Sequence, residues 1–383
     1  MERQRLTVWS VLTVAITILV VVGLLLSAYG GLLDPRSCGY VPSVMVLLLP
    51  LVGSVAVVWT CAVAMMRRWW QAVALGITLL LSLPSLNSVC PAHFGSDLNE
   101  NDSTFIVMTY NVAGFPHIFT EDTCSTMQAI LDIDADIVVM QEMTHSDIDF
   151  RYDTVRGLKP YREELDRRFP YRSYTHKDEV AIMSRFPFTV DTIVPAKKGF
   201  DTINYLQDLD HYPALAFDVM INGHKVRIIS AHLQSYGLGN ADKAITGTNT
   251  DGDFDVMQGS RLYGMSIGDK LNRAFALRAD DAVSLRGAID RGPETVIMCG
   301  DLNDVPGSYS YRTLAGDDMK DAWTECGLGY AYTYNAHRFY FKIDHIMYRG
   351  NLRAVDARVY SDVPQTYTSS DHYPHTATFK FVK

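Results

Sequence analysis

The sequence predicts an α/β domain, in which helices cover buried sheets, preceded by a membrane anchor of three helices. Residues 1–90 contain long apolar stretches without formal charge. From about residue 104 onward, short β-rich apolar runs alternate with helical patterns instead. A chain of 383 residues also exceeds the usual size of a single domain, so two units are expected.

Three segments of the first unit are predicted to cross a membrane. Residues 8–33, 43–66 and 69–86 contain no charged side chain, and the third segment is the shortest, ending near Pro84 and Asn87. At a rise of about 1.5 Å per residue, such runs match a hydrocarbon core about 30 Å thick. A cleaved signal peptide is the alternative for the first segment, but its apolar run is too long and two more follow.

The basic residues predict the orientation of this anchor. Arg3 and Arg5 precede the first segment, Arg67 and Arg68 separate the second from the third, and the next Lys or Arg is Arg151. Cytoplasmic loops are enriched in Lys and Arg. We therefore expect an integral membrane protein, in a bacterial inner membrane, with a cytoplasmic N-terminus and a periplasmic domain after about residue 90. No acid or base inside the segments marks a transport pathway, so anchoring is their simplest role.

The second unit is acidic. Five of the 34 basic and two of the 43 acidic residues lie in residues 1–90, which leaves a net charge of −12 for residues 91–383. An acidic surface does not gather polyanions. This charge weighs against a sequence-independent nuclease, although a bound divalent cation would offset it locally.

Six cysteines are too few for a disulfide framework. Cys38 and Cys90 are both expected at the oxidising outer surface of the membrane, so we predict that they can pair. Two unrelated thiols are the alternative, because a disulfide needs a specific geometry.

Residues 91–103 are polar and rich in turn formers, which is typical of a tether, and residues 104–383 are predicted to form one α/β domain. Helical patterns lie near residues 123–133, 161–169 and 262–289, and residues 237–255 have the composition of a long loop. Strands are predicted for the runs "FIVMTYNV", "DIVVMQE", "EVAIMS", "ALAFDVMI", "KVRIISAHL", "TVIMCGDLN", "KIDHIMY" and "TATFKFV".

Polar side chains recur where these predicted strands end. The residues concerned are Asn111, Glu142, His232, Asp301, Asn303 and Asp344, and the pair Asp371 and His372 precedes the last strand. A charge at the end of a buried strand costs several kcal/mol if it is unpaired. Capped strand ends would explain any one of these residues, whereas a shared pocket explains the whole set better.

The residue types predict the chemistry of that pocket. Glu142 and Asp371 are hard oxygen ligands suited to Mg²⁺ or Mn²⁺, and no cluster has the spacing of a zinc site. Asp301 with Asn303 can hold and deprotonate an attacking water.

The histidines complete this set. His232 and His372 can donate protons to phosphoryl oxygens as negative charge grows there, and Asp344 is the candidate that orients His372. Together these groups predict metal-assisted, in-line hydrolysis of a phosphoester.

Seven motifs in order resemble the endonuclease/exonuclease/phosphatase family, which includes deoxyribonuclease I, abasic-site endonucleases, inositol-polyphosphate phosphatases and neutral sphingomyelinases. The motifs are "TYNVAGF", "DIVVMQEM", "AIMSRFPF", "ISAHLQS", "CGDLND", "KIDHIMY" and "SSDHYP". The resemblance covers about residues 104–382 and looks most like membrane-anchored bacterial members.

This resemblance implies a four-layer α/β/β/α sandwich with two central sheets, and a role for each candidate residue. It implies that Glu142 is the principal metal ligand, that Asp371 is a second acid at or near the metal, and that Asn111 is the amide beside metal and phosphate. His232 would contact the scissile phosphate, and Asp301 and Asn303 would activate the water. Asp344 would be the partner of the final histidine, His372.

Some positions depart from the family pattern. Lys342 stands where many members have Arg, and His345 where many have Tyr. We expect His345 to face outward from its strand or to lie behind the site. The aromatic run at residues 330–341 is either ordinary hairpin packing or a wall that contacts an apolar or base-like group of the substrate.

The sequence thus predicts a membrane-tethered, divalent-metal-dependent phosphoesterase that acts outside the cytoplasm. A lipid head group, nucleic acid and a soluble phosphate ester stay open as substrates. The bilayer contacts residues 8–86, and no protein partner is implied. The alternatives are a nuclease acting on extracytoplasmic nucleic acid, or a non-catalytic binding protein that retains the fold, although no matched catalytic position has been replaced.

Overall fold

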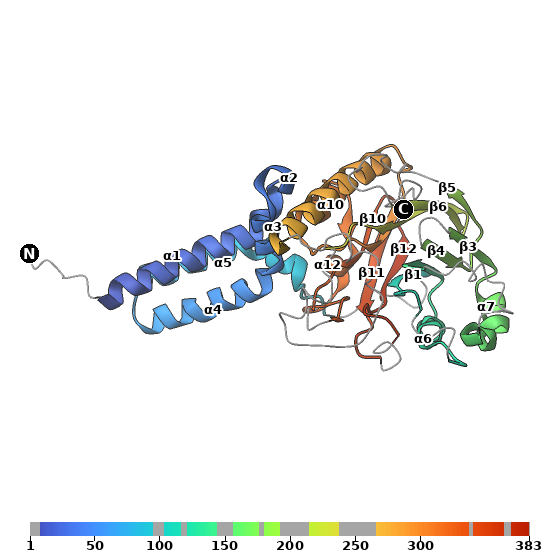
Figure 1. The fold of residues 1–383 in the computed structure, drawn as a ribbon, viewed down its shortest axis with the longest axis horizontal. Coiled ribbons are helices and arrows are strands. Elements are labelled where there is room, and N and C mark those ends of the chain that lie inside the picture. Colours follow the sequence, from blue (N-terminus) through green and yellow to red (C-terminus); the bar gives the residue numbers. More distant parts are fainter. Residues whose placement is uncertain are drawn as a thin grey trace, which may run out of the picture.

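The computed structural model describes residues 8–94, 103–115, 121–143, 156–175, 180–191, 214–236, 266–336, 340–363 and 369–382. A bundle of helices projects from one end of an α/β domain (Figure 1). The bundle and its connections comprise α1 (Val8–Tyr29), η1 (Gly30–Leu32), α2 (Pro35–Cys38), α3 (Tyr40–Leu47), α4 (Leu49–Met65) and α5 (Trp69–Val89).

Two stretches of the bundle are long and apolar enough to span a membrane, namely Val8–Leu32 and α5. The second predicted segment is broken instead: α3 and α4 meet at an angle of 65°, so the count rises to three only if this bent pair forms one span. Pro50 lies in the first turn of α4 and explains why a new helix begins there. Proline lacks an N–H and is tolerated in a first turn, where that group needs no partner.

Helix α5 continues past the point where its sequence predicted an end. Pro84 lies inside the helix, which ends at Val89. Two hydrogen bonds between α1 and α5 support this segment. The Tyr29 hydroxyl of α1 donates to the Leu81 carbonyl, and the Ser85 hydroxyl of α5 donates to the Ala28 carbonyl at 2.8 Å. Neighbouring helices commonly stabilise the backbone around a proline in this way.

Polar side chains inside the bundle join its three long helices. The Thr17 hydroxyl of α1 donates to Gln71 Oε1 of α5 at 3.0 Å and accepts from Trp59 Nε1 of α4 at 3.0 Å. Cys38 and Cys90 are exposed free thiols, so the predicted pairing is not confirmed.

Two six-stranded mixed sheets form the centre of the α/β domain. The first has the order β11–β12–β1–β2–β4–β3, and the second β5–β6–β7–β8–β10–β9. Their strands are β1 (Thr104–Asn111), β2 (Ile137–Gln141), β3 (Tyr171–Thr175), β4 (Val180–Ser184), β5 (Phe188–Asp191), β6 (Ala214–Ile221), β7 (His224–His232), β8 (Val296–Asp301), β9 (Lys320–Asp321), β10 (Asp344–Arg349), β11 (Leu352–Val359) and β12 (His375–Phe381).

The alternation of side chains along these strands builds four layers. On β1, Phe105 and Val107 pack between the sheets, whereas Met108 and Tyr110 pack beneath helix α6. Strand β8 likewise places Cys299 between the sheets and its neighbour Met298 against α10 and α11. The helices of the outer layers and connections are α6 (Ser125–Ile133), η3 (Arg156–Tyr161), α7 (Arg162–Arg168), α10 (Ile267–Asp290), α11 (Tyr309–Ala315) and α12 (Ala322–Cys326). The predicted α/β/β/α sandwich is confirmed.

The predicted strands and helices of this domain are present wherever the structure describes them. Strands β3, β5, β9 and β11 and helices α11 and α12 are additions that the sequence patterns did not predict. The predicted loop at residues 237–255 and most of the tether lie outside the described residues.

One buried histidine should make the stability of this domain depend on pH. His375, at the start of β12, is 0% exposed, and neither ring nitrogen has a hydrogen-bond partner among the described residues. Burial, helped by the nearby Lys342 charge, lowers the pKa of His375 to about 3. The unfolded chain binds a proton below about pH 6.5, so stability should fall as the pH drops from 6.5 toward 3.

We expect His375→Phe to remove this contribution, which amounts to about 2 kcal/mol at pH 5. Thermal unfolding of the full chain in detergent at pH 8 and pH 5 would measure it, with the exposed His224→Phe as the matched control. At pH 5 the Tm of His375→Phe should exceed that of wild type by several degrees more than it does at pH 8. An equal Tm difference at both pH values would contradict the assignment.

Candidate active site

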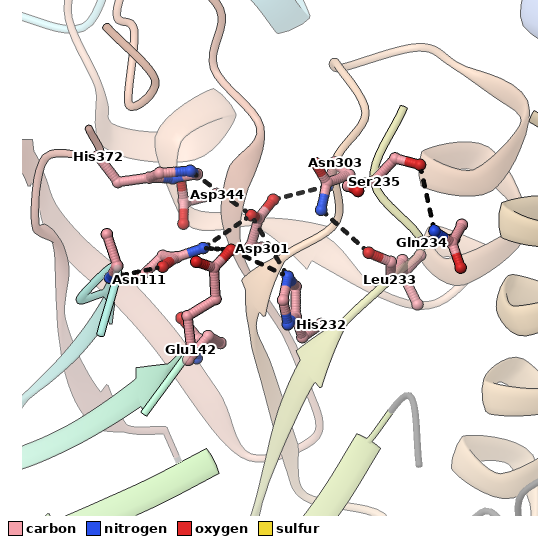
Figure 2. A network of polar contacts seen from close by, with 12 residues as sticks. Asn111, Glu142, His232, Leu233, Gln234, Ser235, Asp301, Asn303, Asp344 and His372 are labelled. Atoms are coloured by element: carbon pink, nitrogen blue, oxygen red, sulfur yellow. Dashed lines mark hydrogen bonds and ion pairs between the residues drawn. The ribbon is translucent and has the colours of Figure 1, made fainter. Parts of the chain in front are cut away.

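Strand ends from both sheets bring the predicted site residues to one edge of the sandwich. In the second sheet, His232 at the end of β7 lies in register with Asp301 at the end of β8. Because β10 runs antiparallel to β8, its first residue, Asp344, also pairs with Asp301. Asn111 ends β1 of the first sheet, and Glu142 directly follows β2. Figure 2 shows these side chains pointing toward a common centre.

Asp301 is that centre. Its side chain is 1% exposed, and its Oδ2 accepts a hydrogen bond from Asn111 Nδ2 at 3.1 Å. The Nε2 atoms of His372 and His232 lie 3.7 and 3.9 Å from the same oxygen (Figure 2). Burial raises the pKa of Asp301, while the charges of the two histidines act against that rise. The carboxylate is thus buried but surrounded by donors.

Glu142 connects this buried centre with solvent. Its Oε1 accepts from Asn111 Nδ2 at 2.9 Å and lies 3.6 Å from His232 Nε2, while 38% of its side chain stays exposed. Its backbone has φ 55°, as Asn303 has φ 50°. Left-handed conformations of non-glycine residues are costly and cluster at functional sites, where the surrounding structure holds them.

Asn303 ties the two strand ends together. Its backbone N–H donates to Asp301 Oδ1 at 2.7 Å, and its side-chain amide donates to the Leu233 carbonyl at 2.9 Å. The segment after β7 is thereby fixed beside the segment after β8. Asn303 and Asp301 are thus joined through the Asn303 N–H, and their role as the pair that activates water stays a prediction.

Asp344 and His372 form a buried pair. His372 Nδ1 lies 2.8 Å from Asp344 Oδ2, which leaves Nε2 facing Asp301. Burial alone would lower the pKa of His372, but the charges of Asp344 and Asp301 hold it well above its usual value. Asp344 therefore orients His372 and favours its protonated form, so this predicted pairing is present.

Two hydroxyl groups hold the pair in place, and neither was predicted from the sequence. The backbone N–H groups of Ile343 and Asp344 both donate to Thr333 Oγ1 at 3.0 Å. Ser370 Oγ donates to the Asn111 carbonyl at 2.8 Å and accepts from the His372 N–H at 3.1 Å. The "SSDHYP" segment is therefore a buried turn that spans the two sides of the site.

Asp371 has a different place from the other seven candidates. It is exposed, although its charge still helps to raise the pKa of His372. Among the described residues, two groups have acidic and imidazole ligand atoms within 4.8 Å of one another: Glu142, His232 and Asp301, and Asp301, Asp344 and His372. Asp371 belongs to neither group, so its role as a metal ligand stays a prediction.

A second charged network lies behind the site. His345 Nδ1 is 3.1 Å from Asp321 Oδ2, and the Lys342 ammonium donates to the Asp344 carbonyl at 3.0 Å. His345 is 0% exposed, so the alternative in which it faces outward is wrong. The Lys342 ammonium lies between the Asp344 carbonyl and the Asp321 carboxylate, 3.7 Å from Asp321 Oδ2. Its positive charge compensates this buried carboxylate.

The donor set fits a hard divalent cation. Glu142 offers carboxylate oxygens beside the Asn111 amide, and because 38% of its side chain is exposed it leaves an approach from solvent. Mg²⁺ and Mn²⁺ prefer such oxygen ligands, together with waters and substrate phosphate.

The Thr333 hydroxyl should contribute measurably to stability. Thr333→Val keeps the shape of the side chain but leaves two buried backbone N–H groups without their acceptor, which should cost about 2 kcal/mol. Thermal unfolding would measure the loss, with Thr189→Val on the exposed face of β5 as the control. Equal Tm values for the two variants would show that the Thr333 contacts contribute nothing.

Comparison with known proteins identifies a family for this chain. The family model described as "Endonuclease/Exonuclease/phosphatase family" matches residues 108–372. Similar solved structures include TDP2 of D. rerio complexed with a single-strand DNA product (16% identity, 73% of this chain and 100% of that chain, TM-score 0.45) and an endonuclease/exonuclease/phosphatase from Bacteroides vulgatus (15%, 73% and 99%, TM-score 0.45). The human Nocturnin catalytic domain with bound sulfate is another (15%, 73% and 96%, TM-score 0.43). No curated protein matches the sequence. Since the family model covers well over half of the chain, the chain belongs to the endonuclease/exonuclease/phosphatase family.

Proposed function

We propose that the chain is a membrane-tethered, divalent-metal-dependent phosphoesterase that hydrolyses a phosphodiester or phosphomonoester outside the cytoplasm. One observation carries the proposal: the buried Asp301 carboxylate lies within 4 Å of two histidines, beside the accessible Glu142 carboxylate. A binding protein would have no need to bury an acid among two imidazoles, because the arrangement costs stability.

In this proposal Asp301 and Asn303 position the attacking water. Asp301 Oδ1 is fixed by the Asn303 N–H, so the carboxylate is held rigidly while it accepts the proton of the water. The water oxygen bonds to phosphorus as the opposite P–O ester bond breaks, and the departing alcohol oxygen takes up a proton.

The two histidines stabilise the charge that develops. His372 is held protonated by Asp344, and His232 lies on the other side of Asp301, so both can donate to phosphoryl oxygens. A bound Mg²⁺ or Mn²⁺, held by Glu142 and, as the resemblance implies, Asp371, would neutralise phosphate charge and polarise the P–O bonds.

The full chain should hydrolyse bis-p-nitrophenyl phosphate with Mg²⁺ or Mn²⁺ and lose this activity in excess chelator. Asp301→Asn should lower kcat by about 10²-fold or more, since the water loses its base. Asp356→Asn, on strand β11, is the matched control and should keep wild-type turnover. Unchanged turnover in Asp301→Asn, or in chelator, would favour the binding protein.

The apolar helices support the tether, and the basic residues around them support the orientation. With the domain in the periplasm, alkaline phosphatase fused after Lys383 should be active in a bacterial host, whereas green fluorescent protein at the same point should stay dark. The opposite pattern would place the domain in the cytoplasm and refute this part of the proposal.

A further inference from the structure

The anchor contacts the loop that follows the active-site residue Asp301. The chain joining α1 to α3 lies against the loop that follows Asp301: a Cβ at Gly31 would be 1.9 Å from the Gly307 carbonyl oxygen, so the two backbones touch. Arg312 of α11 donates from Nε to the same Gly307 carbonyl at 2.8 Å and from Nη2 to the Ala28 carbonyl at 3.2 Å. These contacts fix the outer end of α1 to the active-site loop.

Polar contacts at α2 and α3 extend this junction, which lies where the bundle meets the domain (Figure 1). Arg36 Nη1 donates to Asp280 of α10 at 3.0 Å, and the Tyr40 N–H donates to the Asn272 side chain at 2.8 Å. Helix α10 therefore starts beside the anchor. Strand β8 returns along it in the opposite direction, so Asp301 lies at the end of the sandwich that faces the anchor.

An apolar cluster joins helix α3 to the segment that carries the Asp344–His372 pair. Val46 of α3 packs with Val305 and Ile343, and the rings of Tyr334 and Phe341 pack against the same cluster. Ile343 precedes Asp344 in the chain. The Tyr334 ring meets the His372 ring edge-on, with 5.2 Å between centroids. One layer of side chains thus separates the anchor from His372.

Exposed aromatic side chains continue from this cluster to the ends of α4 and α5 that face the domain. Tyr330 and Phe341 line the same small hollow as Pro50 and Val89, the residues at the outer ends of α4 and α5. Tyr330 is 44% exposed, and its hydroxyl donates to the carbonyl of Tyr340, which is 50% exposed. Leu328 and Phe94 are exposed nearby, at 53% and 85%, where Ala92 pairs with Leu328.

Such a surface is unusual for contact with water alone. Tyrosine and other aromatic side chains favour the interface between lipid and water, because their rings are apolar and their hydroxyls are polar. Exposed apolar residues that continue a transmembrane bundle are best explained by the bilayer itself.

We propose that the active site takes its substrate from the membrane surface: an amphiphile whose phosphoester lies in the head-group layer and whose apolar chain stays in the bilayer beside Tyr330 and Tyr340. This inference rests on the proposed phosphoesterase function and assigns its substrate class. In this proposal the aromatic run at residues 330–341, for which the sequence allowed two interpretations, contacts the apolar part of the substrate.

A pair of substrates that differ only in their apolar chain tests this inference. The full chain in phosphatidylcholine vesicles with Mg²⁺ would be given hexadecyl p-nitrophenyl phosphate or ethyl p-nitrophenyl phosphate. Water attacks the same phosphorus in both, p-nitrophenol leaves, and an alkyl phosphate remains. We expect kcat/KM to be at least about tenfold higher for the hexadecyl ester.

Tethering alone would also favour a membrane-bound ester, so variants must separate the two effects. Tyr330→Ser combined with Tyr340→Ser should lower the hexadecyl-to-ethyl ratio about threefold or more. Phe94→Ser should lower it as well, and this residue is too exposed for its loss to unfold the domain. Tyr171→Ser is the matched control: Tyr171 is 42% exposed on β3, at the end of the domain opposite the bundle (Figure 1).

The outcomes are distinct. Three results would overturn the membrane substrate and still leave a phosphoesterase. They are equal kcat/KM for both esters, an unchanged hexadecyl-to-ethyl ratio in the Tyr330, Tyr340 and Phe94 variants, and faster hydrolysis of a single-stranded oligonucleotide. Hydrolysis of neither ester with Mg²⁺ or Mn²⁺ would instead remove the proposed function, and the inference with it.

Discussion

The burial of Asp301 is the constraint on which the site depends. A carboxylate that is 1% exposed costs several kcal/mol unless donors surround it. Its donors come from both halves of the sandwich: Asn111 ends a strand of the first sheet, while His232 belongs to the second. His372 approaches from the turn before β12, held by Asp344. The two sheets must therefore pack in one register before the charge is compensated, which links correct folding to an assembled site.

Much of the fold was predictable because its central strands are buried on both faces. The run that forms β8 is apolar from Val296 to Gly300, and so short a run between polar turns is typical of a buried strand. Strand β5 is largely exposed and β11 is interrupted by a bulge, so neither sequence shows a clear alternation of apolar and polar residues. The bend between α3 and α4 was missed for a similar reason, since composition detects an apolar segment and does not detect its break.

The candidate site was predictable in its charged members and not in their supports. A charge at the end of an apolar run stands out in a sequence, whereas Thr333 and Ser370 act through backbone groups far along the chain. Asp371 illustrates a further limit. The turn that holds Ser370 against Asn111 buries His372, which bridges to Tyr334, and leaves Asp371 exposed. A motif shows that two polar residues are adjacent, but the backbone decides how far each of them is buried.

The N-terminal helices complete the candidate-site end of the domain. The loop after Asp301 contacts Gly31 through its backbone and the outer end of α1 through Arg312. Val46 occupies an apolar cluster that would otherwise open to water next to Asp344. Removing the helices would expose this surface and free the loop, so the conformation of the site depends on contacts that exist only in the full chain. The packing of the N-terminal helices and the geometry of the candidate site are therefore set by the same interface.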